Sequence, residues 1–194
     1  MKIVPIKFSL AKAIYNLYHK TNIAPIGHRK SYVALEGNEW NKLGYAELLF
    51  DDLEDFDFLE NEIEIRVDDN NDQVIYTKGK VIGICSIGNT IARFKDKNIF
   101  EITRICFPSY FKPKNNKEKK YPSKFIRESI KDFKKNYKVS KLVTYIHNWQ
   151  SGKYLEYAGF KKDKLIVYSN NSKGWSNRSN RNKPDLKPKI RFVA

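Results

Sequence analysis

The sequence predicts one mixed α/β domain with a central β-sheet flanked by helices. The chain has 194 residues, which suits a single domain spanning 1–194. Hydrophobic residues make up 41% of it, enough for a buried core and too many for a disordered chain. Apolar runs of strand length alternate with segments of helical spacing, a pattern typical of a sheet covered by helices.

Strands and helices alternate in the first half of the chain. Residues 3–8 predict a strand, and Ser9 fits an N-cap for a helix over residues 10–20. Further strands are predicted over residues 28–35, 81–87 and 99–107. The last two are apolar runs separated by a short turn, so we expect them side by side at the centre of the sheet.

The second half of the chain predicts a long helix, two more strands and a short helix. Pro122 and Ser123 lead into the long helix, whose apolar face consists of Phe125, Ile126, Ile130 and Phe133. Residues 141–146 predict a fifth core strand, residues 151–157 a short helix, and residues 165–168 another strand.

Charge is distributed very unevenly along the chain. Residues 36–72 contain 14 of the 22 acidic residues and two basic ones, a net charge of −12. The other residues carry 35 basic and 8 acidic side chains, a net charge of +27. So basic a surface attracts polyanions, which makes nucleic acid the leading partner. The alternative is that the lysines form an ordinary solvated face.

Two segments are interpreted as additions to the core. Residues 38–78 form an acidic insertion, in which residues 45–50 and 63–67 would pair as strands, and its removal is expected to leave a folded protein. It would be a solvated insertion, a hairpin covering the sheet edge, a pseudo-substrate for a basic cleft, or a contact for a basic partner. Residues 169–194 form a basic tail with few apolar anchors, expected to be mobile or ordered by a ligand.

The sequence excludes several classes of protein. Cys85 and Cys106 lie in apolar segments, which predicts free buried thiols and a reducing compartment. The N-terminus lacks the apolar stretch of a signal peptide, and no run of 18 apolar residues occurs. We therefore expect a cytoplasmic protein without a membrane span.

A series of short motifs, in order along the chain, resembles the Mom-like DNA-modification proteins of phages and prophages, which have a GNAT-like acyltransferase fold. The resemblance covers nearly the whole chain except residues 38–78. Its motifs are Tyr18-His19-Lys20, Pro25-Ile26-Gly27-His28, Gly83-Ile84-Cys85-Ser86-Ile87-Gly88, Glu101-Ile102-Thr103-Arg104-Ile105-Cys106, Leu142-Val143-Thr144-Tyr145, Tyr157-Ala158-Gly159-Phe160, Gly174-Trp175 and Lys189-Ile190-Arg191-Phe192.

The resemblance implies a transferase that adds a small acyl-derived group to N6 of adenine in DNA and protects that DNA from restriction. It also implies a donor cleft between a splayed strand and the following helix. GNAT proteins usually hold the donor's pyrophosphate with a glycine-containing loop, yet residues 107–123 contain no glycine and are rich in lysine. The identity of the donor stays open. If it is acetyl-CoA, lysines and the N-terminus of the helix at Ser123 would hold its phosphates in place of the usual loop. The alternatives are an N-acetyltransferase acting on a small amine or protein, and a non-catalytic nucleic-acid-binding protein.

Five residues are candidates for catalysis. Arg104 would stabilise negative charge or hold the donor, and Ser123 would contact the donor or cap its helix. His28 would act as an acid, a base or a base-gripping residue. Tyr145 and Ser151 complete the set, and we expect Arg104, Ser123 and Tyr145 to share one cleft. Iron is implied only by the resemblance, with His19 and His28 as weak candidate ligands.

A larger set of basic and aromatic residues is predicted to bind duplex DNA, with a flipped adenine held by stacking. Tyr145, Trp149, Tyr154 and Tyr157 would supply the stacking surfaces, unless they simply pack a helix on the sheet. The predicted DNA-binding residues are Lys112, Lys114, Lys117, Lys119, Lys120, Trp149, Trp175, Arg178, Arg181 and Arg191.

Overall fold

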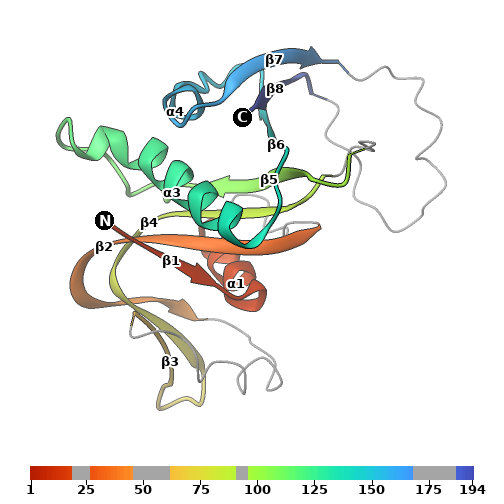
Figure 1. The fold of residues 1–194 in the computed structure, drawn as a ribbon. Helices are drawn as coiled ribbons and strands as arrows, with labels where there is room; N and C mark the ends of the chain where they lie inside the picture. Colours follow the sequence, from red (N-terminus) through yellow and green to blue (C-terminus); the bar gives the residue numbers. More distant parts are fainter. Residues whose placement is uncertain (19–26, 46–61, 91–95, 168–186) are drawn as a thin grey trace.

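The computed structural model describes residues 1–18, 27–45, 62–90, 96–167 and 187–194 (Figure 1). A short 3-10 helix over Glu118–Lys120 precedes the longest helix. The other elements, in chain order, are β1 (Lys2–Ile6), α1 (Phe8–Tyr18), β2 (His28–Tyr45), β3 (Ile63–Val67), β4 (Gln73–Asn89), β5 (Ile99–Cys106), α3 (Tyr121–Asn136), β6 (Lys141–His147), α4 (Lys153–Tyr157), β7 (Lys161–Ile166) and β8 (Lys189–Val193).

One mixed sheet runs through the molecule. Its strand order is β1-β2-β4-β5-β6-β8-β7, and β3 pairs with β4 off this path. β5 and β6 are parallel, whereas the neighbouring pairs β4–β5 and β6–β8 are antiparallel. The helices lie on both faces, with α1 and α3 on opposite sides (Figure 1). This arrangement confirms the mixed α/β fold class, with a central sheet flanked by helices, and the central place of β4 and β5.

Each face of the sheet has its own apolar core. The core under α3 includes Phe125, Ile126, Ile130 and Phe133, so the predicted apolar face of this helix is confirmed. The core under α1 includes Ile14 and Tyr15, both fully buried. α1 begins at Phe8, so Ser9 lies inside the first turn and the predicted N-cap is wrong.

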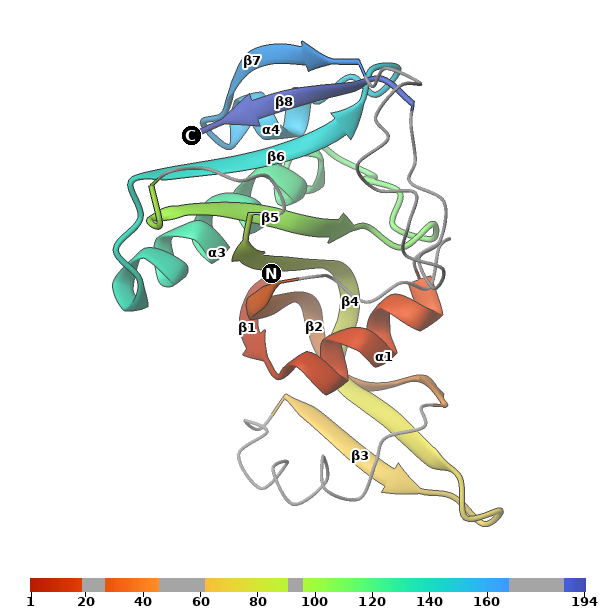
Figure 2. The same ribbon diagram turned by 90° about the vertical axis from the view of Figure 1, so that its right-hand side faces the viewer.

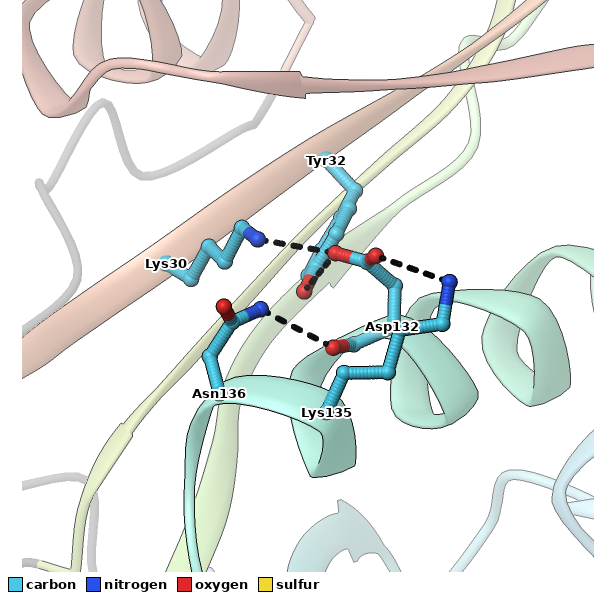
Figure 3. Close-up of polar contacts among 5 residues, drawn as sticks. All are labelled: Lys30, Tyr32, Asp132, Lys135 and Asn136. Atoms are coloured by element: carbon cyan, nitrogen blue, oxygen red, sulfur yellow. Dashed lines mark hydrogen bonds and ion pairs between the residues drawn. The ribbon is translucent and has the colours of Figure 1, made fainter.

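A polar cluster holds the C-terminal half of α3 against β2 (Figure 3). The Asp132 carboxylate accepts hydrogen bonds from the Lys30 ammonium at 2.8 Å and from the Tyr32 hydroxyl at 3.1 Å. The hydrogen bond from Lys30 lowers the pKa of Asp132 below its ordinary value. Burial, followed by the nearby Asp132 charge, raises the pKa of Tyr32. The cluster therefore ties the helix to the sheet by a charged contact at the margin of the apolar core.

The predicted insertion is largely a continuation of two core strands. β2 extends to Tyr45 and β4 begins at Gln73, and these outer halves pair with each other. β3 pairs with β4. The sequence predicted that residues 63–67 would pair with residues 45–50, but residues 46–61 lie outside the described residues. We call residues 36–45 and 62–80 the β arm.

The β arm contributes to the core under α1. Ile63 and Ile75 are 2% and 0% exposed, and both belong to that core. A Cβ atom added at Gly44 would lie 2.8 Å from the Leu17 side chain, so α1 packs directly on the arm. The described part of residues 38–78 is therefore integral to the fold, and its removal would expose α1.

The end of the predicted basic tail is a strand inside the sheet. β8 lies between β6 and β7, and its Phe192 is fully buried. Gly152 has φ +64, and a Cβ atom there would lie 2.6 Å from the Phe192 ring. The end of the chain is thus held by packing, whereas residues 168–186 lie outside the described residues.

Candidate active site

The central feature of the candidate site is the place where β5 and β6 stop pairing and separate, which we call the opening. The two parallel strands pair at only three positions, from Ile99 with Lys141 to Glu101 with Val143. The Thr144 hydroxyl then donates to the Ile102 carbonyl at 3.0 Å. Beyond this contact the strands diverge toward their C-terminal ends (Figure 2). Residues 103–106 of β5 therefore present an edge that β6 does not pair with in the described structure.

A β-bulge at Thr103 marks the start of this edge. Ser86 of β4 lies opposite Arg104, and Ile87 lies opposite Ile102, so Thr103 is the extra residue. The Thr103 hydroxyl donates to the Ser86 carbonyl at 3.3 Å. Because a bulge shifts the alternation of side chains, Ile102 belongs to the core under α3 whereas Arg104 lies on the α1 face, opposite Ser86.

A chain of hydrogen bonds, which we call the hydroxyl chain, runs under α1 from His28 to the bulge. His28 Nε2 and Ser31 Oγ are 2.9 Å apart, and Ser31 Oγ and Ser86 Oγ are 2.6 Å apart. Ser86 Oγ and the Tyr15 hydroxyl are 3.0 Å apart, and that hydroxyl reaches the Arg104 carbonyl at 3.3 Å. The two serines and Tyr15 are fully buried. The chain thus joins β2, β4, α1 and β5 at the point where the opening begins.

Burial changes the acid–base properties of the groups around the bulge. It lowers the pKa of His28 and raises the pKa of Tyr15. It also lowers the pKa of Arg104 and raises the pKa of Cys106, whose thiol is close enough to feel the Arg104 charge. Arg104 therefore holds a half-buried positive charge on the α1 face, where electrostatic interactions are stronger than in water.

Two other predicted catalytic residues, Tyr145 and Ser123, lie on opposite faces of the sheet. Leu142 and Ile146 of β6 belong to the core under α3, so Tyr145 faces the opposite side, as Arg104 does. Ser123 lies on α3, which covers the other face; its hydroxyl donates to the Lys120 carbonyl at 3.0 Å. α3 begins at Tyr121, so Ser123 is not its N-cap. Convergence of all three on one donor stays a prediction.

His28 and Ser151 have different surroundings. The His28 ring lies 4.6 Å from the Phe8 ring and contacts Ser31 through Nε2. Ser151 is exposed, and the N-cap of α4 is Gly152 in the left-handed conformation, so Ser151 does not cap this helix. Among the residues that the structure describes, no group of three or more His, Cys, Asp or Glu side chains could hold a metal ion. His19 lies outside them.

The lysine-rich loop leads directly into α3. Its backbone is braced by Glu118, whose carboxylate accepts hydrogen bonds from the Lys114 N–H at 2.6 Å and the Asn115 amide at 2.7 Å. Lys119 and Lys120 stand at the helix N-terminus. The positive end of the helix dipole and these two lysines favour anions there, so phosphate groups fit this position. All five lysines of the loop, Lys112, Lys114, Lys117, Lys119 and Lys120, are exposed.

The aromatic residues near the end of β6 do not form a single stacking surface. Trp149 is 61% exposed and stacks on His147 with ring centroids 4.2 Å apart. Tyr154 packs edge-on against Phe107, whereas Tyr157 is 73% exposed. Packing therefore accounts for Tyr154, and Trp149 and Tyr157 remain accessible.

The C-terminal candidates are only partly described. Arg191 lies in β8 and forms an ion pair with Asp163, so its charge is compensated within the sheet. Trp175, Arg178 and Arg181 lie outside the described residues. Within the described part of the chain, no helix is both long enough and apolar enough to span a membrane.

Sequence reasoning missed Tyr15, Ser31 and Ser86 as members of the site. Two serines inside apolar strands were a possible signal, because a buried hydroxyl needs a partner. Their pairing depends on the register of β2 and β4, which places Ser31 directly opposite Ser86.

Comparison with solved structures finds acetyltransferases at low sequence identity. An IAA acetyltransferase from Bacillus cereus is 18% identical with a TM-score of 0.49, over 99% of this chain and 98% of that one. The aminoglycoside acetyltransferase AAC(6')-Ib in complex with coenzyme A is 11% identical with a TM-score of 0.49, over 100% of this chain and 94% of that one. No protein-family model and no curated protein matches the sequence. Likenesses this weak assign no activity to the chain.

Proposed function

We propose that this protein is an N-acyltransferase that binds a phosphate-bearing acyl donor, such as acetyl-CoA, in the opening between β5 and β6. The observation that carries the proposal is the early end of the parallel pairing, after Glu101 and Val143. Past it, the backbone N–H and C=O groups of β5 can pair with the amide groups of an extended donor, as an added strand would. Lys119, Lys120 and the N-terminus of α3 supply positive charge for the donor's phosphates.

The chemistry requires a group that stabilises negative charge on the acyl oxygen. The acceptor amine would attack the carbonyl carbon of the acetyl-CoA thioester and form an amide as the C–S bond breaks. Coenzyme A would leave as the thiol, taking up the proton that the amine loses. Arg104 is the candidate for stabilising the oxygen, because its cation is half-buried beside the opening. The acceptor would enter from the α1 face, where Arg104 and Tyr145 both lie.

Calorimetric titration with coenzyme A tests the donor site. Lys119→Glu with Lys120→Glu should weaken binding by about tenfold or more, since one lost charge-assisted hydrogen bond is worth roughly 1.5–3 kcal/mol. Lys134→Glu with Lys138→Glu is the charge-matched control. Lys134 lies 14 residues beyond Lys120, about 21 Å along the helix and past the screening length at physiological salt. Absence of binding, or equal weakening by both pairs, would refute the donor site.

Adenine modification in DNA is the second candidate function. Its support is the net charge of +27 outside residues 36–72, which suits a polyanionic acceptor. The two functions differ in the acceptor, so coenzyme A release should be measured with a panel of amines and with duplex DNA, followed by mass analysis of the nucleosides. A modified deoxyadenosine would favour DNA modification, whereas coenzyme A release with small amines alone would exclude it.

A further inference from the structure

We propose that the hydroxyl chain positions the Arg104 peptide at the bulge and that its direction is set by His28. The proposal rests on the proposed function, in which this stretch of β5 borders the donor. Tyr15 is then a positioning residue, since it acts through Arg104 and is itself fully buried.

Counting protons gives two orders in which every hydroxyl donates and all three side-chain contacts of the chain hold a hydrogen bond. Ser31, Ser86 and Tyr15 each have one hydroxyl proton, whereas the Arg104 carbonyl can only accept. In the forward order, His28 Nε2–H donates to Ser31, Ser31 to Ser86, Ser86 to Tyr15, and Tyr15 to Arg104. In the reverse order, Tyr15 donates to Ser86, Ser86 to Ser31, and Ser31 to His28 Nε2.

Among the four contacts that make up the chain, the forward order makes one more hydrogen bond than the reverse order. It uses all four contacts, including the one from Tyr15 to the Arg104 carbonyl at 3.3 Å. The reverse order uses only the contacts of 2.9, 2.6 and 3.0 Å among the side chains. Because the sites are buried, an additional hydrogen bond is favourable, so the forward order and the Nε2–H tautomer of His28 should predominate.

Protonation of His28 permits only the forward order, because both ring nitrogens then carry a proton. Among the described residues that contact the ring, none is an acid. α1 contributes Phe8 at 4.6 Å, and β2 contributes Ser31 and Arg29. β4 contributes Asn89, which accepts a hydrogen bond from Arg29 at 3.1 Å. The side chain of Lys30 is bonded to Asp132 in the cluster that anchors α3.

The consequence for the site is that the bulge has a fixed and a released form. When Tyr15 donates to the Arg104 carbonyl, α1 and β5 are linked at the residue whose cation would stabilise the acyl oxygen. When the order reverses, this link is lost without any change in the sheet pairing. Loss of the link should therefore lower the rate of transfer and leave donor binding unchanged.

Nuclear magnetic resonance of the His28 ring nitrogens tests the chain in the intact protein without any ligand. Tyr15→Phe removes the acceptor for Ser86, so the reverse order should become favoured and His28 should move from the Nε2–H to the Nδ1–H tautomer. Tyr18→Phe is the matched control, because it also removes a tyrosine hydroxyl from α1. In the described structure that hydroxyl bonds only Tyr110. Its His28 spectrum should match the parent's. A second variant, Ser31→Ala, removes the hydroxyl that joins His28 to Ser86. In that background, adding Tyr15→Phe should leave the His28 tautomer unchanged.

An unchanged His28 tautomer in Tyr15→Phe overturns the proposal, whether or not the protein transfers acyl groups. A tautomer shift confined to Tyr15→Phe supports it. If transfer occurs, Tyr15→Phe should lower kcat by about threefold to tenfold, as loss of one buried hydrogen bond predicts, with the KM for the donor unchanged. A tautomer shift in a protein that shows no transfer supports the hydroxyl chain and refutes the proposed function alone.

Discussion

Truncating Ile75 to alanine should strongly destabilise the whole domain, although this residue lies in the segment that resembled an insertion. Ile75 is 0% exposed and belongs to the core under α1. Ile→Ala at such a site costs about 2–5 kcal/mol, because apolar contacts are lost and a cavity remains. A domain of this kind has a total stability of roughly 5–15 kcal/mol, so the variant should retain only part of it.

The control for this prediction lies on the same β arm. Val67 is 61% exposed, so Val67→Ala should change the free energy of unfolding by no more than about 0.5 kcal/mol. Urea unfolding followed by circular dichroism measures both variants. Removal of residues 38–77 eliminates Ile63, Val74 and Ile75 together and should abolish cooperative unfolding. A truncated protein that unfolds cooperatively with the parent's stability would show that the arm is separable and that this reasoning is wrong.

Three further predictions concern the site, the α3 anchor and the end of the chain. Arg104→Ala should reduce acyl transfer by about 10²–10³ with coenzyme A affinity little changed, and a rate within threefold of the parent would remove Arg104 from the mechanism. Lys30 lowers the pKa of Asp132 in the folded state. The contact therefore contributes its full stabilisation at pH values above the pKa of the unfolded carboxyl, near 3.9, and that stabilisation is lost as the pH falls through the lower pKa of the folded state. The free energies of unfolding of the parent and of Lys30→Gln, measured as a function of pH, should therefore converge at low pH. A difference between them that stays constant down to low pH would contradict this linkage. Gly152→Ala should lower the melting temperature, because the left-handed backbone and the Phe192 ring 2.6 Å from the new Cβ both oppose it; an unchanged melting temperature would mean that the loop adjusts freely.

The candidate site was predictable where a residue's role follows from its own segment. Arg104 was identified from its position near the end of an apolar strand together with the resemblance, which places an arginine there, and the lysines from their density in one loop. The bulge at Thr103 was not predictable, because it depends on how β4 and β5 align. Without it, Arg104 would share the face of Ile102 and point into the core under α3. Tyr15 escaped notice because a tyrosine at helical spacing usually serves as core, and it is the packing of α1 on the sheet that brings its hydroxyl to Ser86 and Arg104.

The sequence by itself determined the mixed α/β class, the amphipathic face of α3, the free buried cysteines and the segregation of charge. These features follow from periodicity and composition, which are local properties of the chain. Only the tertiary structure decided that the β arm belongs to the core, that the last strand enters the sheet between β6 and β7, and that the strands part beyond Glu101 and Val143. Those outcomes depend on contacts between segments far apart in sequence, whose register and packing no single segment encodes.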